Sequence, residues 1–226
     1  EVAQAWYNLR SKGGMLPAQQ REGILKQALE LGRTEPGASL TGLTDAMLLY
    51  AKQTGTTDPN QIQNVIKQTL TEAGSDISGL GQYLPRFLPI GTKAGLSGAE
   101  SAGLWAFATG QLGEPSEATT ALRNTFLSLQ GKGTPASQEL LSGLGISPEM
   151  DFWQKIQGRS RAQAAGRFGA DEAETISGSE EIAMTLSLVS DPTGMMRTVR
   201  SVTGAARTRR DLTAESISGL MATDRG

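Results

Sequence analysis

Glycine and proline divide this sequence into short segments, which limits the length of any regular element that it can form. The chain contains 28 Gly and 9 Pro, and both residue types are more common at the ends of helices than inside them. Between these breaks, apolar residues recur at the three- and four-residue spacing of a helix face. The segment 59–74 carries such a stripe, formed by Ile62, Val65, Ile66 and Leu70. We therefore predict an all-α fold of short helices packed as helical hairpins, followed by a less regular helical C-terminal arm.

Two helix starts are predicted from an N-cap residue that is followed by proline. Asp58 precedes Pro59, and Ser147 precedes Pro148. An Asp or Ser oxygen can accept a hydrogen bond from the first turn of a helix, and proline fits the first helical position because its missing N–H is not needed there. We expect the helix that starts at Ser147 to carry Phe152, Trp153 and Ile156.

The apolar segment 83–90 contains Pro85 and Pro89, which complicates its assignment. Each proline limits helix extension and pushes the preceding residue toward extended geometry. The segment is therefore predicted to be a short helix or an apolar connector packed beneath the neighbouring helices. A docking strip for a partner is the alternative interpretation.

Residue types absent from the sequence exclude several classes of function. The chain contains no Cys and no His, which excludes disulfides, thiolate nucleophiles, His-based acid–base pairs and most zinc or iron sites. No Asp-x-Asp loop suits a hard cation, so we expect neither a metal nor a cofactor. The net charge of -2 gives no global reason to bind nucleic acid or anionic membrane, and no apolar run approaches the roughly 18 residues of a membrane span.

The character of the sequence changes near residues 158–169. Aromatic residues end at Phe168, while Arg, Ala, Ser and Gly become more frequent. We predict an N-terminal helical lead-in at 1–37, a helical core at 38–157 and an Arg/Ser/Gly-rich helical arm at 158–226. Because the chain begins at Glu1 rather than Met, we also expect it to be a fragment of a longer chain.

The arm contains a basic run with no acidic residue between positions 193 and 210. Such a run could contact phosphates or an acidic surface, and the alternative is a solvated helix face. The candidate anion contacts are Arg197, Arg200, Arg207, Arg209 and Arg210.

Two parts of the sequence look alike. Gly-Leu-Thr at 42–44 is followed by an apolar stretch and by Asp58-Pro59, and Gly-Leu-Ser at 95–97 is followed by another and by Glu114-Pro115. The starts lie 53 residues apart (95 − 42) and the prolines 56 apart (115 − 59). This spacing favours a degenerate repeat of two helical hairpins that bury their aromatic faces against each other. The alternative is chance, since capping residues recur in all helical proteins.

The signals from residue 95 to residue 146 follow a specific order. A Gly-Leu-Ser start at 95–97 precedes an apolar helix, and a Glu-Pro start at 114–115 precedes a second helix with Ala-Leu-Arg-Asn at 121–124. The region closes with Glu-Leu-Leu at 139–141 and Leu-Gly-Ile at 144–146. This order resembles the helical core region of phage tail tape measure proteins. The sequence departs from that pattern at Gly98 and Ala99, where paired acids often stand, and at Thr119-Thr120, which replaces an Ala-Gly pair.

The resemblance implies a structural component of a phage or prophage tail. Tape measure proteins are long helical chains that occupy the tail tube, set tail length during assembly and are released with DNA at infection. The partners implied are tail tube and tail-tip or baseplate proteins, tail assembly chaperones, further copies of the chain in a trimer or other homo-oligomer, and DNA in transient contact. The location implied is the tube lumen or tail tip of the virion, and the host cytoplasm during assembly.

A muralytic segment is the enzymatic alternative, because residues 102–110 resemble the Gly-Leu-Trp-Gln-Phe segment of lytic transglycosylases. Those enzymes need a Glu well upstream to protonate the glycosidic oxygen. Here Glu100 immediately precedes the segment, only Asp76 could substitute for it, and Ala106 replaces the Gln. We therefore predict no enzymatic activity, with a non-enzymatic phage or bacterial adaptor as a further alternative. The aromatic residues are expected to be packing anchors, namely Tyr50, Trp105, Phe107, Phe126 and Trp153.

Overall fold

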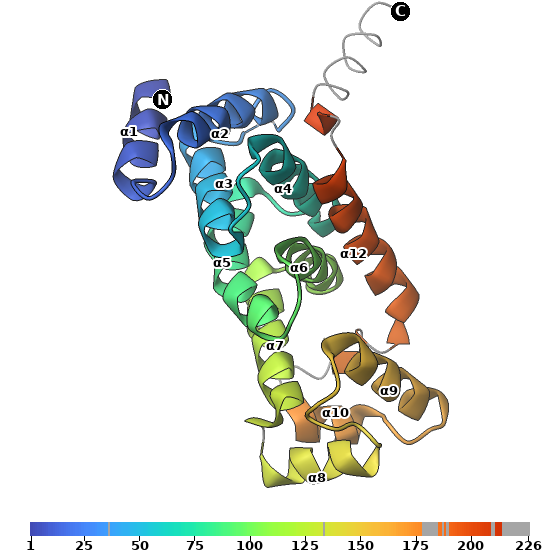
Figure 1. Ribbon diagram of the computed structural model, residues 1–226. Helices are drawn as coiled ribbons and strands as arrows, with labels where there is room; N and C mark the ends of the chain where they lie inside the picture. Colours follow the sequence, from blue (N-terminus) through green and yellow to red (C-terminus); the bar gives the residue numbers. More distant parts are fainter. Residues whose placement is uncertain are drawn as a thin grey trace, which may run out of the picture.

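Short helices make up the regular structure of the chain. The computed structural model describes residues 1–35, 37–132, 134–177, 185, 186, 188, 190–208 and 211–213. These residues form eleven α-helices and one short π-helical segment, without a strand among them, which confirms the predicted all-α fold (Figure 1). The helices are α1 (Val2–Lys12), α2 (Ala18–Leu31), α3 (Leu40–Thr54), α4 (Pro59–Ala73), α5 (Ile77–Lys93), α6 (Gly98–Leu112), α7 (Pro115–Leu127), η1 (Ser128–Lys132), α8 (Pro135–Gly143), α9 (Phe152–Ala164), α10 (Ala170–Ser177) and α12 (Pro192–Arg207).

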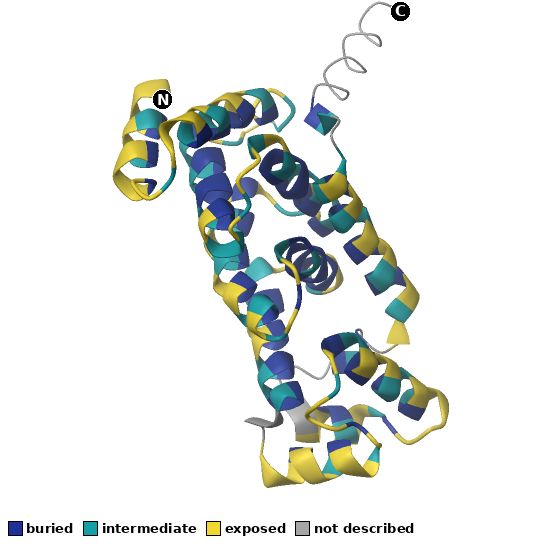
Figure 2. Cartoon of the chain, viewed as in Figure 1, coloured by how far each residue is buried: buried dark blue, intermediate teal, exposed yellow. Residues whose placement is uncertain are grey.

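Helix α6 lies at the centre of the molecule and is enclosed by other helices. It packs against α4, α5, α7 and α12, and Figure 1 shows it nearly end-on between them. Every residue from Ser101 to Thr109 is buried, in contrast to the exposed outer faces of the surrounding helices (Figure 2). A helix that is apolar on all sides is stable in water only when neighbours cover each side. The four neighbouring helices meet this requirement by covering α6.

Small residues on α6 allow α12 to approach closely. A Cβ atom added to Gly103 would lie 2.7 Å from the Cα atom of Val199 in α12. Helix α12 buries Met195, Val199 and Val202 on the side facing the body of the molecule. The α6–α12 contact is the most extensive between any two helices of the described chain. The glycine therefore sets the distance at which the last helix covers the central one.

Helix α5 is longer than the sequence predicted, because it continues through both prolines. It runs from Ile77 to Lys93 with Pro85 and Pro89 inside it, so the interpretation as a short helix or connector is wrong. Pro89 has no N–H to donate to the carbonyl oxygen of Pro85, as a residue at that position in a helix normally does. The side chain of Gln53 in α3 supplies a replacement, with its Nε2 atom 2.8 Å from that oxygen. A tertiary contact thus satisfies the carbonyl that the proline leaves unpaired.

The caps of two other helices correct the predicted starts. Helix α9 begins at Phe152 rather than near Ser147, because Asp151 and Gln154 form a reciprocal capping box. Helix α3 is capped by Ser39, so the Gly-Leu-Thr sequence at 42–44 lies inside the helix. Helix α6 is capped by Ser97, and the two capping serines are 58 residues apart (97 − 39) rather than 53. A capping oxygen three residues before a free N–H decides each start.

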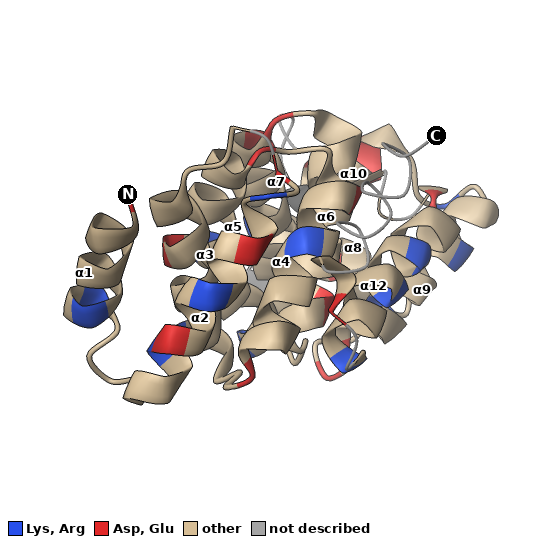
Figure 3. Ribbon diagram, turned by 90° about the horizontal axis from the view of Figure 1, so that it is seen from above, with Lys and Arg blue, Asp and Glu red and all other residues tan. Residues whose placement is uncertain are grey.

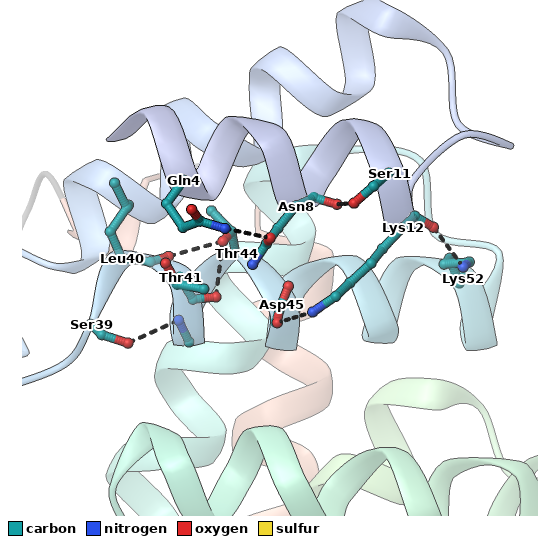
Figure 4. A network of polar contacts seen from close by, with 11 residues as sticks. Gln4, Asn8, Ser11, Lys12, Ser39, Leu40, Thr41, Thr44, Asp45 and Lys52 are labelled. Atoms are coloured by element: carbon teal, nitrogen blue, oxygen red, sulfur yellow. Dashed lines mark hydrogen bonds and ion pairs between the residues drawn. The ribbon is translucent and has the colours of Figure 1, made fainter. Parts of the chain in front are cut away.

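Helix α1 is held on α3 by apolar packing together with exposed polar contacts (Figure 4). Its buried residues are Ala5 and Leu9. The Nζ atom of Lys12 lies 2.6 Å from Oδ2 of Asp45, and Lys52 donates to the carbonyl oxygen of Lys12 at 2.9 Å. Exposed ion pairs of this kind contribute ~0–1 kcal/mol, so the apolar side chains determine how firmly α1 is docked.

The buried apolar residues form two separate clusters. The main core extends through α1–α7 and includes residues of α12. A smaller cluster lies where α8, α9 and α10 meet and consists of Leu141, Ile146, Ala162, Phe168 and Ala173. Helix α9 joins the two, since Phe152 and Ile156 belong to the main core and Ala162 to the smaller cluster. The domain division predicted between residues 157 and 158 falls inside this helix.

Replacing Gly103 by Ala tests the close approach of α6 and α12. We expect Gly103→Ala to destabilise the protein by ~1–3 kcal/mol, because the added methyl group meets the backbone at Val199 and overpacking costs about that much. Gly204→Ala is the matched control, since Gly204 lies in α12 with open space around its Cα. It should stabilise the protein by up to ~1 kcal/mol through helix propensity alone. Urea unfolding would measure both, and equal midpoints for the two variants would contradict the packing described.

Candidate functional site

Glu100, the carboxylate nearest to the transglycosylase-like segment, caps the central helix. Its Oε2 atom accepts a hydrogen bond from the backbone N–H of Ser97 at 2.8 Å, while Oγ of Ser97 accepts one from the N–H of Glu100. The Nε1 atom of Trp153 lies 3.4 Å from the second carboxylate oxygen. Asp76, the other acid considered, caps α5 by accepting from the N–H of Gly79 at 2.7 Å. Both carboxylates thus satisfy backbone donors at helix starts.

Trp105 is fully buried, and its one polar atom is paired. Its indole Nε1 donates to Oγ1 of Thr119 in α7 at 2.8 Å, and that hydroxyl donates in turn to the carbonyl oxygen of Pro115. Buried Trp side chains usually need such a partner for the N–H. Thr119 is one of the positions at which the sequence departs from the tape measure pattern. The departure supplies the acceptor that the buried indole uses.

The five predicted packing anchors occupy different environments. Tyr50, Trp105, Phe107 and Phe126 are buried, and Trp153 is half-buried against the main core. Burial raises the pKa of the Tyr50 phenol. Two residues that were not among the predicted anchors complete a row of aromatic rings with Phe126 and Trp153. These are Phe87, 5.3 Å from Phe126 between ring centroids, and Phe152, 4.5 Å from Phe126.

Three of the five predicted anion contacts lie on the exposed face of α12. Arg197, Arg200 and Arg207 point away from the buried side of the helix and are exposed. Figure 3 shows basic segments on α12 and on the neighbouring α9. Arg209 and Arg210 lie outside the described residues. The described part of the predicted basic run is therefore a solvent-facing stripe on a helix that covers α6.

Two basic residues of α9 are buried, which the sequence did not indicate. The Nζ atom of Lys155 donates to the carbonyl oxygens of Leu129 and Pro148, at 2.9 and 2.7 Å. Arg159, one turn later, is fully buried, and none of its three guanidinium nitrogens has a hydrogen-bond partner among the described residues. Burial lowers the pKa of Lys155, and it lowers the pKa of Arg159 to about 9. In sequence both look like ordinary surface residues of a polar helix.

The surface hollow beside α8 offers no charged group for chemistry. The hollow between η1 and α8 has a volume of about 610 Å³, and none of its lining residues is charged: they are Leu129, Gln130, Gln138, Leu141, Ser142, Gly145, Ile146, Ser147 and Pro148. In the described part of the chain, no cluster of three or more acidic residues could hold a metal ion. None of the described helices is both long and apolar enough to cross a membrane. The site with the most distinctive geometry is therefore the packed environment of α6.

Comparison with known families relates this arrangement to phage tails. A family model described as phage-related minor tail protein matches residues 1–168, which include α1 to α9 and the whole of the enclosed central helix. The chain belongs to this family. No curated protein and no solved structure matches the chain. This minor tail protein is thus a helical structural component of a phage tail, which confirms that part of the sequence-based prediction. Helices α10 and α12 lie beyond the matched residues.

Removing the acceptor for the Trp105 indole tests the polar contact inside the core. Thr119→Val keeps the side-chain shape but leaves a buried N–H without a partner, so we expect a loss of ~1–3 kcal/mol of stability. Thr120→Val is the control, because Thr120 is exposed on the same helix, and it should change stability by less than ~0.5 kcal/mol. Chemical denaturation followed by circular dichroism measures both. A Thr119→Val variant as stable as the control would contradict the assigned role of this hydrogen bond.

Proposed function

We propose that this chain is an ordered helical module of a tape measure protein, which sets tail length during assembly and is released with DNA at infection. The observation that carries the proposal is the match of residues 1–168 to a minor tail protein family, together with the tape measure-like order of signals from 95 to 146. That order corresponds to α6, α7 and α8. The residues that resemble a tape measure protein thus include the helix around which the core is built.

The proposed role is structural rather than enzymatic. A glycosidase of the transglycosylase type needs a protonated carboxylic acid poised beside its substrate. The two nearest carboxylates, Glu100 and Asp76, accept hydrogen bonds from backbone N–H groups at helix N-termini, so both are engaged in capping. Trp105 and Phe107 are buried in the core and are not available to bind a sugar. These contacts support the non-enzymatic reading.

The proposed partners are the tail tube, the tail-tip or baseplate proteins, tail assembly chaperones and further copies of this chain. The proposed location is the tube lumen or tail tip, after assembly in the host cytoplasm. The exposed stripe of Arg197, Arg200 and Arg207 supports transient contact with DNA phosphates. An adaptor that binds one partner protein is the remaining alternative, and it is distinguished by its lack of effect on tail length.

Tail length measured by electron microscopy tests the proposal. In-frame deletions in the gene outside these 226 residues should shorten the tails by ~1.5 Å per deleted residue, the rise of an α-helix. The Gly204→Ala substitution within the module is the control, because it changes no chain length and should leave the tails unchanged. Tails that keep their length across a series of deletions would exclude the tape measure role and favour the adaptor.

Incubation with purified peptidoglycan tests the non-enzymatic assignment. We expect no release of soluble muropeptides by the wild-type chain, because its candidate acids cap helices. Should the wild type release them, Glu100→Gln and Asp76→Asn would identify which carboxylate acts. Activity that is lost in either variant while the fold is retained would replace the structural role by a muralytic one.

A further inference from the structure

A buried cation, Arg159, lies beside the small cluster of α8, α9 and α10, and none of the described residues forms a hydrogen bond with its guanidinium. Arg159 lies in the C-terminal half of α9, and its guanidinium is fully buried without a hydrogen-bond partner in the described structure. Its guanidinium lies over the Phe168 ring, whose centroid is 5.8 Å from the Cζ atom. A cation–π contact at that distance compensates only part of the hydration that the guanidinium has lost.

Lys155, on the same helix, is a buried cation whose hydrogen bonds are satisfied. Its ammonium group donates to two carbonyl oxygens, those of Leu129 in η1 and of Pro148. Lys155 is therefore fixed by hydrogen bonds, whereas Arg159, four residues later, is not. The uncompensated cost of removing a cation from water therefore falls on Arg159, in the half of α9 that contributes Ala162 to the small cluster. The N-terminal half of α9 is held by Phe152 and Ile156 in the main core.

Among the described residues, few apolar side chains of α8 and α10 oppose this cost. Helix α8, which is described throughout, buries only Ser137 and Leu141, and α10 contributes Ala173. Two hollows border the region: the one of about 610 Å³ beside α8, and another of about 380 Å³ lined by residues from Leu144 to Arg167. The chain enters the region through the π-helical segment η1, a geometry that occurs mostly as short, locally irregular turns within helices.

We propose that α8 and α10 form an opening unit, which separates from the C-terminal half of α9 while the main core stays folded, and that the hydration of Arg159 favours this opening. The separation would expose Leu141, Ile146 and Phe168 together with the guanidinium. Closing the unit again requires the guanidinium to leave water. The open state is therefore more populated than it would be with a neutral side chain at position 159. The inference rests on the geometry around Arg159 and does not depend on the tape measure proposal.

Hydrogen exchange of the full chain, followed by mass spectrometry, tests the opening unit. In the wild type, amides of α8 and α10 should exchange faster than those of α6, and their exchange should depend less on added urea than global unfolding does. Arg159→Met keeps most of the side-chain length without the charge, and should slow exchange in α8 and α10 by about tenfold while leaving α6 unchanged. Arg161→Met is the matched control, because Arg161 is exposed on the same helix.

Three results would overturn the proposal. The first is exchange of α8 and α10 at the rate and urea dependence of α6, which needs only the wild-type chain. The second is an Arg159→Met variant whose α8 and α10 amides exchange as fast as those of the wild type, or faster. The third is equal slowing by Arg159→Met and Arg161→Met, which would assign the effect to net charge. Arg159→Lys, which keeps a cation at this position, should retain the fast exchange and thereby separate charge from packing.

Discussion

The enclosure of α6 on all sides is the constraint from which the rest of the structure follows. A helix that buries every residue from Ser101 to Thr109 has to be covered by several neighbours, and α4, α5, α7 and α12 do so. Close packing requires small side chains at the contacts, as at Gly103 against α12, and a partner for each buried polar atom. Thr119 provides that partner for Trp105. The central helix thus specifies both the shape of its neighbours and the position of one hydroxyl group.

Features decided by local chemistry could be predicted from the sequence, and features decided by tertiary contacts could not. The all-α class follows from the spacing of apolar residues, and the start of α4 follows from Asp58 and Pro59. The continuation of α5 through Pro85 and Pro89 depends on Gln53 from another helix, which no local pattern reveals. The start of α9 was misplaced because the capping box at Asp151 takes precedence over Ser147 and Pro148. Arg159 resembles Arg161 in sequence, and what distinguishes them is tertiary: Arg159 is buried and lies over the Phe168 ring.

The residues with the most conspicuous chemistry in the sequence stabilise the fold. Glu100 caps the helix that it begins, Trp105 fills the core, and the lysine of α9 secures η1. These assignments agree with the structural role of a minor tail protein. The exposed arginines of α12 are the exception, since their charges face solvent and make no ion pair within the described structure.

The position of α12 has a consequence for how the protein is made. It covers α4 and α6, elements that lie far earlier in the chain. During synthesis, the side of α6 that receives Val199 stays open to water until residues 192–207 have left the ribosome. Contacts between such distant segments slow folding and prolong the exposure of apolar surface. The nascent chain therefore presents an uncovered strip around Gly103 while residues 113–191 are translated, and whatever binds that strip at this stage competes directly with α12.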